Sequence, residues 1–396
     1  MKNWPLDTFA KVKTPFYFYD MDTLNKHITI ASNAAIKFDY SIHYAIKANH
    51  QFRVLKEMES AGFGADCVSE NELLEALNAG FSPSKILLAG VGKTDNEIRL
   101  AISHSIKAIH VESLEELEVI NEIAIELGSC AQIALRINPN VNANTHPSIT
   151  TGLNENKFGI SLNKINDLIA LLKNLSHIKI IGLHFHIGSQ IEDLYVFKTL
   201  SLKVNEIWSF FLSAGFNLNY LNLGGGLGVD YYSPDDSIPP FEKYFSVFNK
   251  FLSVGKNTKI HFELGRSLIA HSGSLISKVL YVKKGDEKDF LILDAGMTDL
   301  IRPALYQSYH QIDNLSSNEE DHIYDIVGPV CESSDTFATK RALSKASRHH
   351  LVAIRSAGAY GQVMSSNYNL RPSPKAFFSD EIVFTESLQT ELKLVI

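Results

Sequence analysis

The chain has 396 residues, of which 45% are hydrophobic and 20% charged, values typical of a soluble globular protein with one large and one smaller domain. The formal net charge of -7 is too small to indicate a nucleic-acid partner, and neither a signal peptide nor an apolar run of membrane-spanning length is present. The three cysteines lie far apart and form no C-x-x-C motif, which favours a reducing cytoplasm over a disulfide framework or a zinc site.

Alternating strand-like and helical stretches dominate the first two thirds of the sequence. An aromatic strand at residues 14–19 comes first, and Asp22 then has the chemistry of a helix N-cap. Eight strands with intervening helices predict a (β/α)8 barrel rather than an open, doubly wound sheet. The predicted strands are 41–46, 64–68, 86–89, 108–112, 132–138, 178–187, 219–223 and 259–263, and the predicted helices include 52–58, 70–79, 114–127, 163–174, 196–214 and 241–254.

Past about residue 270 the helical pattern gives way to short stretches rich in β-branched residues and bounded by Gly, Pro, Asp and Asn. We interpret them as a mostly antiparallel β-domain that the early aromatic strand joins. The predicted domains are therefore an N-terminal segment of the β-domain at 1–30, a barrel at 31–270 and the C-terminal β-domain at 271–396. The predicted strands of the last region are 274–283, 290–294, 322–327 and 351–356.

A lysine, Lys47, follows directly after the first barrel strand. Barrels place their chemistry at the C-terminal ends of their strands. An ammonium group buried there loses solvation, so its pKa falls and the neutral amine can attack a carbonyl. A lone lysine at a strand end more often extends along the rim with its charge in water. The functional interpretation of Lys47 therefore depends on the motifs that follow.

Three later strand ends carry polar or glycine-rich motifs. His184 and His186 point the same way from one strand, which suits a metal pair or the face of a flat cofactor; no comparable cluster follows at another strand end, so we discount metal. Residues 224–228 (GGGLG) could hold a phosphate on their backbone N–H groups, or form a turn that needs positive φ. Residues 262–266 add Glu263 and Arg266. A phosphate pocket, a ring face, an acid and a reactive lysine together indicate pyridoxal 5'-phosphate (PLP).

Short motifs occur along nearly the whole chain, at 44–49, 64–69, 146–152, 156–159, 186–190, 224–228, 302–306, 331–335 and 358–361. In this order they resemble the motifs of the alanine-racemase-like, fold type III PLP-dependent decarboxylases. One departure is Leu264, because the family usually has proline between the glutamate and the glycine of the eighth-strand motif. The charged residues are retained, so we expect only a small change in loop rigidity.

The resemblance implies a role for each cofactor-binding position. Lys47 would bind PLP covalently, and His186 would stack on the ring. Glu263 would face the pyridine nitrogen and keep it protonated, which makes the ring a strong electron sink. The remaining cofactor-binding residues that the resemblance implies are Ser189, Gly225, Gly226, Gly265, Arg266 and Tyr360.

Within this family the chain looks like the members that convert meso-2,6-diaminopimelate to L-lysine and CO2, the last step of bacterial lysine biosynthesis. That substrate carries a second amino-acid group at its far end, so its pocket needs a cation for the carboxylate and an anion for the ammonium. Arg266 and Arg302 suit the carboxylate, and Glu332 suits the ammonium. Tyr306 and Tyr360 would complete the pocket by hydrogen bonding.

The resemblance also assigns catalysis to Cys331, which would return a proton to the carbon that loses CO2. In the family Cys331 and Glu332 reach the site from a neighbouring subunit, which implies a homodimer with shared sites. One alternative is a related decarboxylase of ornithine, lysine, arginine or carboxynorspermidine, in which Arg302 and Tyr306 would have less to do. Another is a non-catalytic PLP-binding protein, which would lack the β-domain and with it Cys331.

Overall fold

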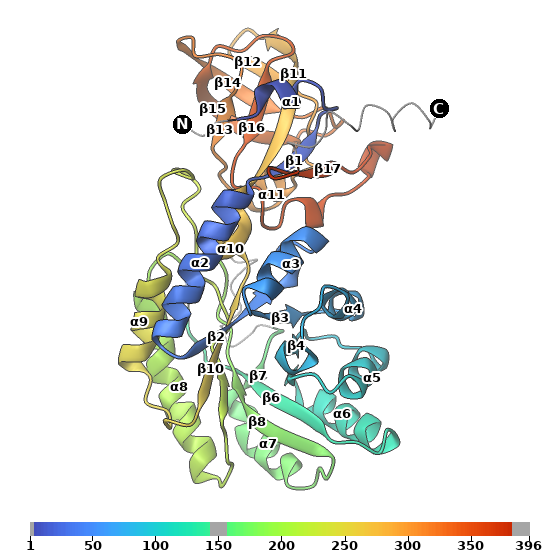
Figure 1. Ribbon diagram of the computed structural model, residues 1–396, viewed down its shortest axis with the longest axis vertical. Coiled ribbons are helices and arrows are strands. Elements are labelled where there is room, and N and C mark those ends of the chain that lie inside the picture. The colour runs from blue at the N-terminus through green and yellow to red at the C-terminus, as the bar shows by residue number, and fades with distance from the viewer. Residues whose placement is uncertain (1–3, 143–156, 382–396) are drawn as a thin grey trace. The chain divides into compact units, whose positions relative to one another are not determined.

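The computed structural model describes residues 4–142 and 157–381 (Figure 1), so the motif at 146–152 and Asn156 lie outside the described residues. The chain divides into two compact units. The first comprises Met1–His27, Val229–Ile238 and Leu268–Ile396, and the second comprises Ile28–Gly228 and Pro239–Ser267. The segment Val229–Ile238 groups with the first unit although it falls inside the range predicted for the barrel.

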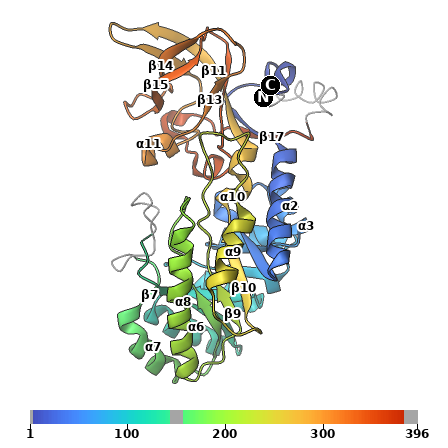
Figure 2. The same ribbon diagram turned by 90° about the vertical axis from the view of Figure 1, so that its left-hand side faces the viewer.

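The second unit is built around a closed ring of eight parallel strands (Figures 1 and 2). The strand order is β5-β4-β3-β2-β10-β9-β8-β6, and the pairing of β5 with β6 closes the ring, while β7 extends it at β6. The predicted (β/α)8 fold is thereby confirmed. The strands are β2 (Tyr40–Ala45), β3 (Gly64–Cys67), β4 (Ile86–Leu88), β5 (Ala108–Val111), β6 (Ala131–Asn138), β7 (Ile160–Ser161), β8 (Ile178–His184), β9 (Tyr220–Asn222) and β10 (Lys259–Leu264).

Helices alternate with these strands along the chain. The first of them begins at Met21, and the Thr23 amide donates to the Asp20 carboxylate at 3.1 Å, so Asp20 caps this helix and the prediction for Asp22 was wrong. One helix, at Asp95–Ser103, was absent from the predicted set. The helices are α2 (Met21–Lys37), α3 (Phe52–Ser60), α4 (Glu70–Asn78), α5 (Asp95–Ser103), α6 (Leu114–Glu126), α7 (Ile165–Leu172), α8 (Tyr195–Ser213) and α9 (Phe241–Phe251).

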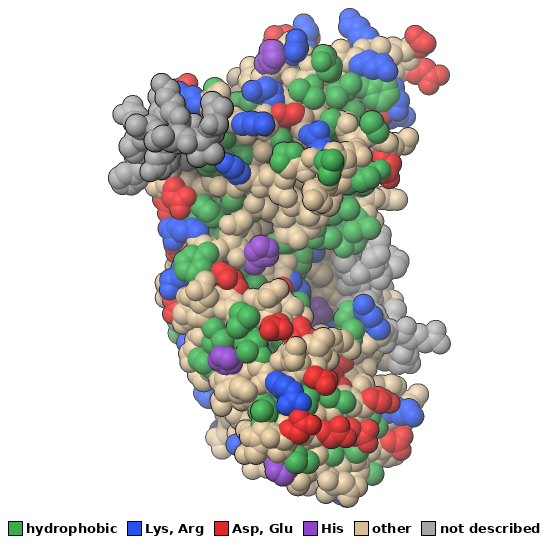
Figure 3. Space-filling view, turned by 90° about the vertical axis from the view of Figure 1, so that its right-hand side faces the viewer, with side chains coloured by type: hydrophobic (Ala, Val, Ile, Leu, Met, Phe, Trp, Pro, Cys, Tyr) green, Lys and Arg blue, Asp and Glu red, His purple; other side chains and the backbone are tan. Residues whose placement is uncertain are grey.

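Three consecutive helices, α4, α5 and α6, begin with the same kind of side-chain N-cap. Ser69, Thr94 and Ser113 each accept, through the side-chain oxygen, a hydrogen bond from the amide of a glutamate three residues later. Acidic residues in the first turn also stabilise the positive end of the helix dipole. Figure 3 shows acidic side chains gathered over α4, α5 and α6, so part of the net negative charge of the chain lies on this surface.

Apolar side chains fill one layer of the barrel interior, where Leu87, Ala108, Ala134, Ile181 and Tyr220 form a buried cluster. Several other inward positions are polar and buried, above all in β3, β5, β8, β9 and β10. Buried polar groups need partners. The hydrogen bonds among these side chains therefore fix the geometry of the site described below.

The first unit contains a mostly antiparallel sheet with the order β13-β16-β11-β12-β14-β15, and β1 pairs with both β11 and β17. The pairs β12–β14 and β1–β17 are parallel. This confirms the predicted β-domain, and the early aromatic strand pairs within its sheet. No described helix of either unit is long and apolar enough to cross a membrane. The helix α10 (Arg266–Ile269) begins in the second unit and ends in the first. The other elements are α1 (Leu6–Phe9), β1 (Phe16–Tyr19), β11 (Gly273–Lys284), β12 (Asp289–Leu293), α11 (Arg302–Tyr306), β13 (Ile312–Asn314), β14 (Asp321–Val327), β15 (Thr336–Ser344), β16 (Leu351–Ile354) and β17 (Lys375–Phe378).

Candidate active site

Lys47 lies in a single turn of 3-10 helix, Ile46–Ala48, directly after β2. Its two neighbours are buried, whereas 39% of the Lys47 side chain is exposed, and its Nζ lies 3.2 Å from Oδ2 of Asp66 at the end of β3. Gly265 follows β10 next to this turn, and a Cβ there would lie 2.9 Å from that of Ala48. Glycine therefore allows the ends of β2 and β10 to approach closely, with Lys47 at the rim.

The charge of Lys47 acts on two buried carboxyl groups, those of Asp66 and Glu263. Burial, together with the charge of Glu263 on β10, raises the pKa of Asp66 to about 7, while Lys47 opposes the shift. Burial likewise raises the pKa of Glu263 to about 7, with Lys47 and Arg136 acting in the opposite direction. Both groups therefore change charge near neutral pH.

The raised pKa of Glu263 predicts a pH-dependent stability change in the cofactor-free protein. Unfolded Glu263 ionises near its ordinary pKa of 4.5, whereas the folded group ionises near 7, so ionisation of this group destabilises the fold increasingly as the pH rises from 4.5 to 7. Glu263→Gln removes the cost, and the cofactor-free variant is expected to gain up to about 3 kcal/mol at pH 8 but little at pH 4.5. Thermal unfolding at both pH values measures the difference.

A surface carboxylate provides the control for that measurement. Glu206 forms an exposed pair with Lys203, and such pairs contribute little to stability. Glu206→Gln should therefore shift the melting temperature by a similar, small amount at both pH values. A gain for Glu263→Gln that is equal at pH 4.5 and pH 8 would contradict the buried, titrating carboxyl.

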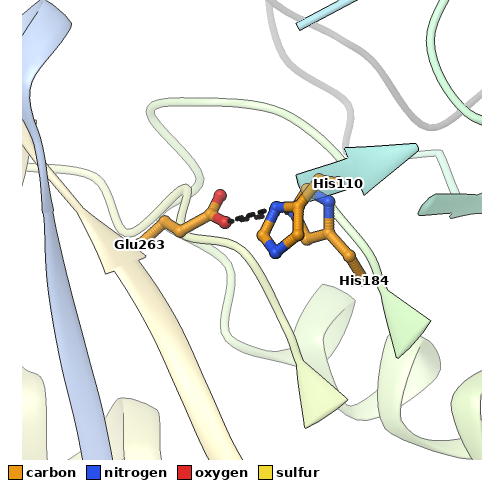
Figure 4. A group of neighbouring side chains, drawn as sticks. All are labelled: His110, His184 and Glu263. Atoms are coloured by element: carbon orange, nitrogen blue, oxygen red, sulfur yellow. Dashed lines mark ion pairs between the residues drawn. The ribbon is translucent and has the colours of Figure 1, made fainter. Parts of the chain in front are cut away.

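The carboxylate of Glu263 faces two histidines (Figure 4). Its Oε1 lies 3.4 Å from Nδ1 of His110 on β5 and 3.3 Å from Nε2 of His184 at the end of β8. The amide of Asn222 on β9 donates to the same oxygen at 2.8 Å. Burial lowers the pKa of both imidazoles well below the usual range, so His110 and His184 are neutral.

The spacing of these three side chains is compatible with a metal site, because one potential ligand atom each of His110, His184 and Glu263 lies within 4.8 Å of the others. The two imidazole rings, however, are stacked with their centroids 4.0 Å apart and their planes at 28° (Figure 4). Their nitrogen lone pairs therefore run nearly side by side, whereas the ligands of a tetrahedral zinc ion converge on one point. The trio is better suited to hold the carboxylate itself.

His186 lies just beyond β8, against the glycine-rich segment 224–228. The Gly225 amide donates to Nδ1 of His186 at 3.2 Å, so the neutral imidazole carries its proton on Nε2. A Cβ at Gly224, whose φ is +64°, would lie 2.6 Å from the same nitrogen, and a Cβ at Gly225 would lie 1.8 Å from the Glu263 carbonyl oxygen. Only glycine fits this narrow layer, which therefore presents backbone rather than side chains.

Arg266 and Ser189 lie together at the same end of the barrel. The Arg266 guanidinium donates from Nη2 to Oγ of Ser189 at 3.0 Å, and 7% of Arg266 is exposed. Leu264, where the family usually has proline, is the buried last residue of β10 and pairs with Tyr44. The residue at this position thus lies within a regular barrel strand.

Cys331 and Glu332 belong to the first unit, on the loop between β14 and β15, and both are exposed. The carboxylate of Asp335 organises this loop, because it accepts hydrogen bonds from the amides of Val330 at 2.7 Å and Met297 at 2.6 Å. The Ser334 hydroxyl donates to Glu332 at 3.0 Å. The cysteine and the glutamate are therefore presented on a loop fixed at its base.

The other predicted substrate-binding residues also belong to the first unit. Arg302 begins α11 and is buried; its Nη1 donates to the Tyr231 hydroxyl at 2.8 Å and lies 3.2 Å from Nε2 of His310. Tyr306 ends the same helix. Tyr360 is partly exposed, with a φ of +55°. One terminal nitrogen of the Arg302 guanidinium is thus held by groups from two other segments.

The second unit brings Lys47 near Glu263, His186 against Gly225, and Ser189 against Arg266. The site residues predicted from the sequence did not include Asp66, His110, Tyr220 or Asn222. The available signal was a polar side chain at an inward position of a strand that is otherwise apolar. Such a position predicts that the polar side chain is buried, but it does not predict which other buried polar groups it contacts.

Comparison with known proteins places these features in a family. The model of the pyridoxal-dependent decarboxylase, pyridoxal binding domain, matches residues 21–270. A diaminopimelate decarboxylase of Bacteroides thetaiotaomicron is 49% identical over 382 residues, which cover 96% of this chain and 99% of that protein. The crystal structure of the Helicobacter pylori diaminopimelate decarboxylase with L-lysine matches at a TM-score of 0.89 and 40% identity, covering 94% of this chain and 93% of that one.

A second solved structure agrees with these two relatives. Diaminopimelate decarboxylase from M. jannaschii, in co-complex with L-lysine, matches at a TM-score of 0.85 and 34% identity, over 95% of this chain and 89% of that one. The agreement in sequence and in fold extends over both units. The chain therefore belongs to the pyridoxal-dependent decarboxylase family, and curated relatives at 40% to 49% identity over most of its length are named diaminopimelate decarboxylases.

Proposed function

We propose that this protein binds PLP and decarboxylates meso-2,6-diaminopimelate to L-lysine and CO2. The observation that carries the proposal is the placement of Lys47 and Glu263 at the carboxyl ends of adjacent strands, β2 and β10, beside a layer that only glycine fits. The names of the relatives, and the L-lysine bound in two of their structures, support the choice of substrate. The three free cysteines are in keeping with a cytoplasmic location.

The residues present fit PLP group by group. An aldehyde needs an amine, and Lys47 supplies one at the rim with Asp66 as its hydrogen-bond partner. A protonated ring nitrogen needs an anion, and Glu263 is a buried carboxylate on the neighbouring strand. A phosphate needs N–H and O–H donors, which Gly226, Gly265, Ser189 and Arg266 can provide, whereas the Gly225 amide donates to His186.

When bound, PLP would supply an electron sink for the pair of electrons that CO2 leaves behind. Glu263 would hold the proton on the ring nitrogen, and the imidazole face of His186 would fix the plane of the ring. Lys47 would hold the cofactor until substrate arrives. Cys331 would then donate a proton to the α-carbon of the product.

The far end of the substrate would be recognised by charge. Arg266, Arg302, Tyr306 and Tyr360 would bind the distal carboxylate, and Glu332 the distal ammonium. Because Cys331 and Glu332 are exposed on their loop, we propose that they complete the site of a second subunit in a homodimer.

Replacing Glu263 by glutamine is expected to lower turnover about 100-fold or more while the cofactor still binds. Gln keeps the shape of the side chain and the hydrogen bond from Asn222 but removes the negative charge from the ring nitrogen. Steady-state kinetics and the absorbance of bound cofactor test this together. Unchanged turnover with bound cofactor would remove Glu263 from the ring nitrogen.

A substrate panel tests the proposed activity itself. CO2 release is measured with meso-diaminopimelate, ornithine, lysine, arginine and carboxynorspermidine, and L-lysine is identified as the product. We expect release from meso-diaminopimelate alone, because only that substrate uses both charges of the distal site. Preferential release from ornithine, lysine, arginine or carboxynorspermidine would assign the chain to a related decarboxylase. Bound PLP with no release from any substrate would indicate a binding protein.

A further inference from the structure

A hydrogen-bond chain through three barrel strands ends on Glu263, and it fixes which nitrogen of His110 carries the proton. The first link is Asn222. Its Oδ1 accepts from the Gly224 amide at 2.8 Å, so the orientation of the side-chain amide is set and Nδ2 is the donor. That Nδ2 donates to Glu263 Oε1 at 2.8 Å and to the Tyr220 hydroxyl oxygen at 3.0 Å.

The second link is the Tyr220 hydroxyl. Burial raises its pKa well above the usual range, so it keeps its proton. Its oxygen accepts from Asn222, and within the described part of the chain the other group within hydrogen-bond distance is Nε2 of His110, at 3.0 Å. The phenolic O–H is satisfied only if this nitrogen accepts it. Nε2 of His110 is therefore the unprotonated ring nitrogen.

The third link follows from charge. A neutral imidazole carries one proton, and since Nε2 is the acceptor the proton of His110 is on Nδ1. That N–H lies 3.4 Å from Glu263 Oε1, beyond a well-aligned hydrogen bond, so it acts on the carboxylate as a dipole. His184 approaches the same oxygen at 3.3 Å, and among the described residues neither of its ring nitrogens has a hydrogen-bond partner that would fix its tautomer.

Within the described ranges, the neighbouring polar side chains approach only one oxygen of the Glu263 carboxylate. His184 and His110 both approach Oε1 of Glu263 (Figure 4). Asn222 donates to the same oxygen, whereas Oε2 has no hydrogen-bond partner among the described residues. We propose that His110, held in the Nδ1–H tautomer by Tyr220, is a positioning residue that stabilises the anion of Glu263 through Oε1 and leaves Oε2 for the ring nitrogen of PLP. This inference rests on the proposed function, which places Glu263 at that nitrogen.

The consequence can be measured on the cofactor. If a donor to Oε1 is lost, the Glu263 carboxylate becomes more basic and draws the shared proton away from the ring nitrogen. Holoenzyme reconstituted with PLP labelled with 15N in the ring reports this proton directly by NMR. Tyr220→Phe removes the hydroxyl that holds His110 in the Nδ1–H tautomer, so an unprotonated ring nitrogen of His110 can face Glu263. His110→Leu removes the N–H donor altogether. Both are expected to move the 15N resonance toward the neutral pyridine value and to lower kcat about tenfold with little change in KM.

Two further variants separate positioning from packing. His110→Asn places an amide N–H where Nδ1 of the imidazole lay, and it is expected to retain most of the wild-type 15N shift. Tyr244→Phe removes a hydroxyl from an equally buried barrel tyrosine that contacts the Gly225 carbonyl oxygen at 3.4 Å, and it should leave the shift unchanged. Melting temperatures identify any variant that fails to fold.

The outcomes are distinguishable. A wild-type resonance in folded Tyr220→Phe and His110→Leu would overturn the role of His110. If Glu263→Gln also kept that resonance, the position proposed for Glu263 would be wrong as well. Should neither variant fold, the 15N shifts of the His110 ring in wild-type holoenzyme decide the question: Nδ1–H supports the proposal and Nε2–H overturns it.

Discussion

Lys47→Ala is expected to reduce turnover to background and to abolish covalent attachment of PLP, while the barrel still folds. The amine is the group that the cofactor aldehyde needs, and no substitution by a methyl group can replace it. The fold should survive because the side chain is 39% exposed at the end of its strand. Borohydride reduction of wild-type holoenzyme, followed by peptide mapping, should place the cofactor on the peptide that contains Lys47.

Lys56 provides a matched control for that variant. Its side chain is 40% exposed, and its ammonium pairs with Glu59 at 3.1 Å, much as Lys47 pairs with Asp66. Lys56→Ala should retain both the absorbance of bound cofactor and turnover. Recovery of the reduced cofactor on a lysine other than Lys47 would show that the assignment is wrong.

Mixing two inactive variants is expected to restore activity if the site is shared between subunits. When Lys47→Ala and Cys331→Ala proteins exchange subunits, a mixed dimer holds one site with both substitutions and one site with neither. Random pairing makes half of the dimers mixed, so activity should rise to about a quarter of wild type. In the proposed arrangement Cys331 would act in the partner's site, and Lys47 in its own.

The alternative arrangement gives the opposite result. If Cys331 served the site of its own subunit, every site of a mixed dimer would carry one substitution and no activity would return. Mass spectrometry must show that mixed dimers formed. The matched control is a mixture of Lys47→Ala with Lys47→Ala,Cys331→Ala double variant, which has no intact site in either arrangement and should stay inactive.

The sequence by itself determined the architecture of the barrel and the positions of its charged strand ends. Each barrel strand contains a short run of buried residues, and the pattern of apolar residues over that run is enough to predict the strand. Lys47, His186 and Glu263 could be selected as candidates because each ends or follows such a run. The helix at Asp95–Ser103 was missed, although its Thr94–Glu97 capping box is a recognisable start signal.

Two of the β-domain strands that escaped prediction, β13 and β15, were missed for local reasons. β13 spans three residues, Ile312–Asn314, and includes Asp and Asn, which have low strand propensity. β15 lies at the end of the sheet order, so much of it is exposed and its pattern is polar. Pairing with neighbours stabilises both strands, and a single stretch of sequence does not contain that information.

Only the tertiary structure decided which buried groups meet. His110 and Glu263 are on β5 and β10, separated by more than 150 residues in sequence, and they come together because eight strands close into a ring. Register then decides which face each side chain takes, since a shift of one residue would turn His110 away from the interior. The sequence thus supplied the reactive groups, whereas barrel closure and register supplied the contacts that set their protonation.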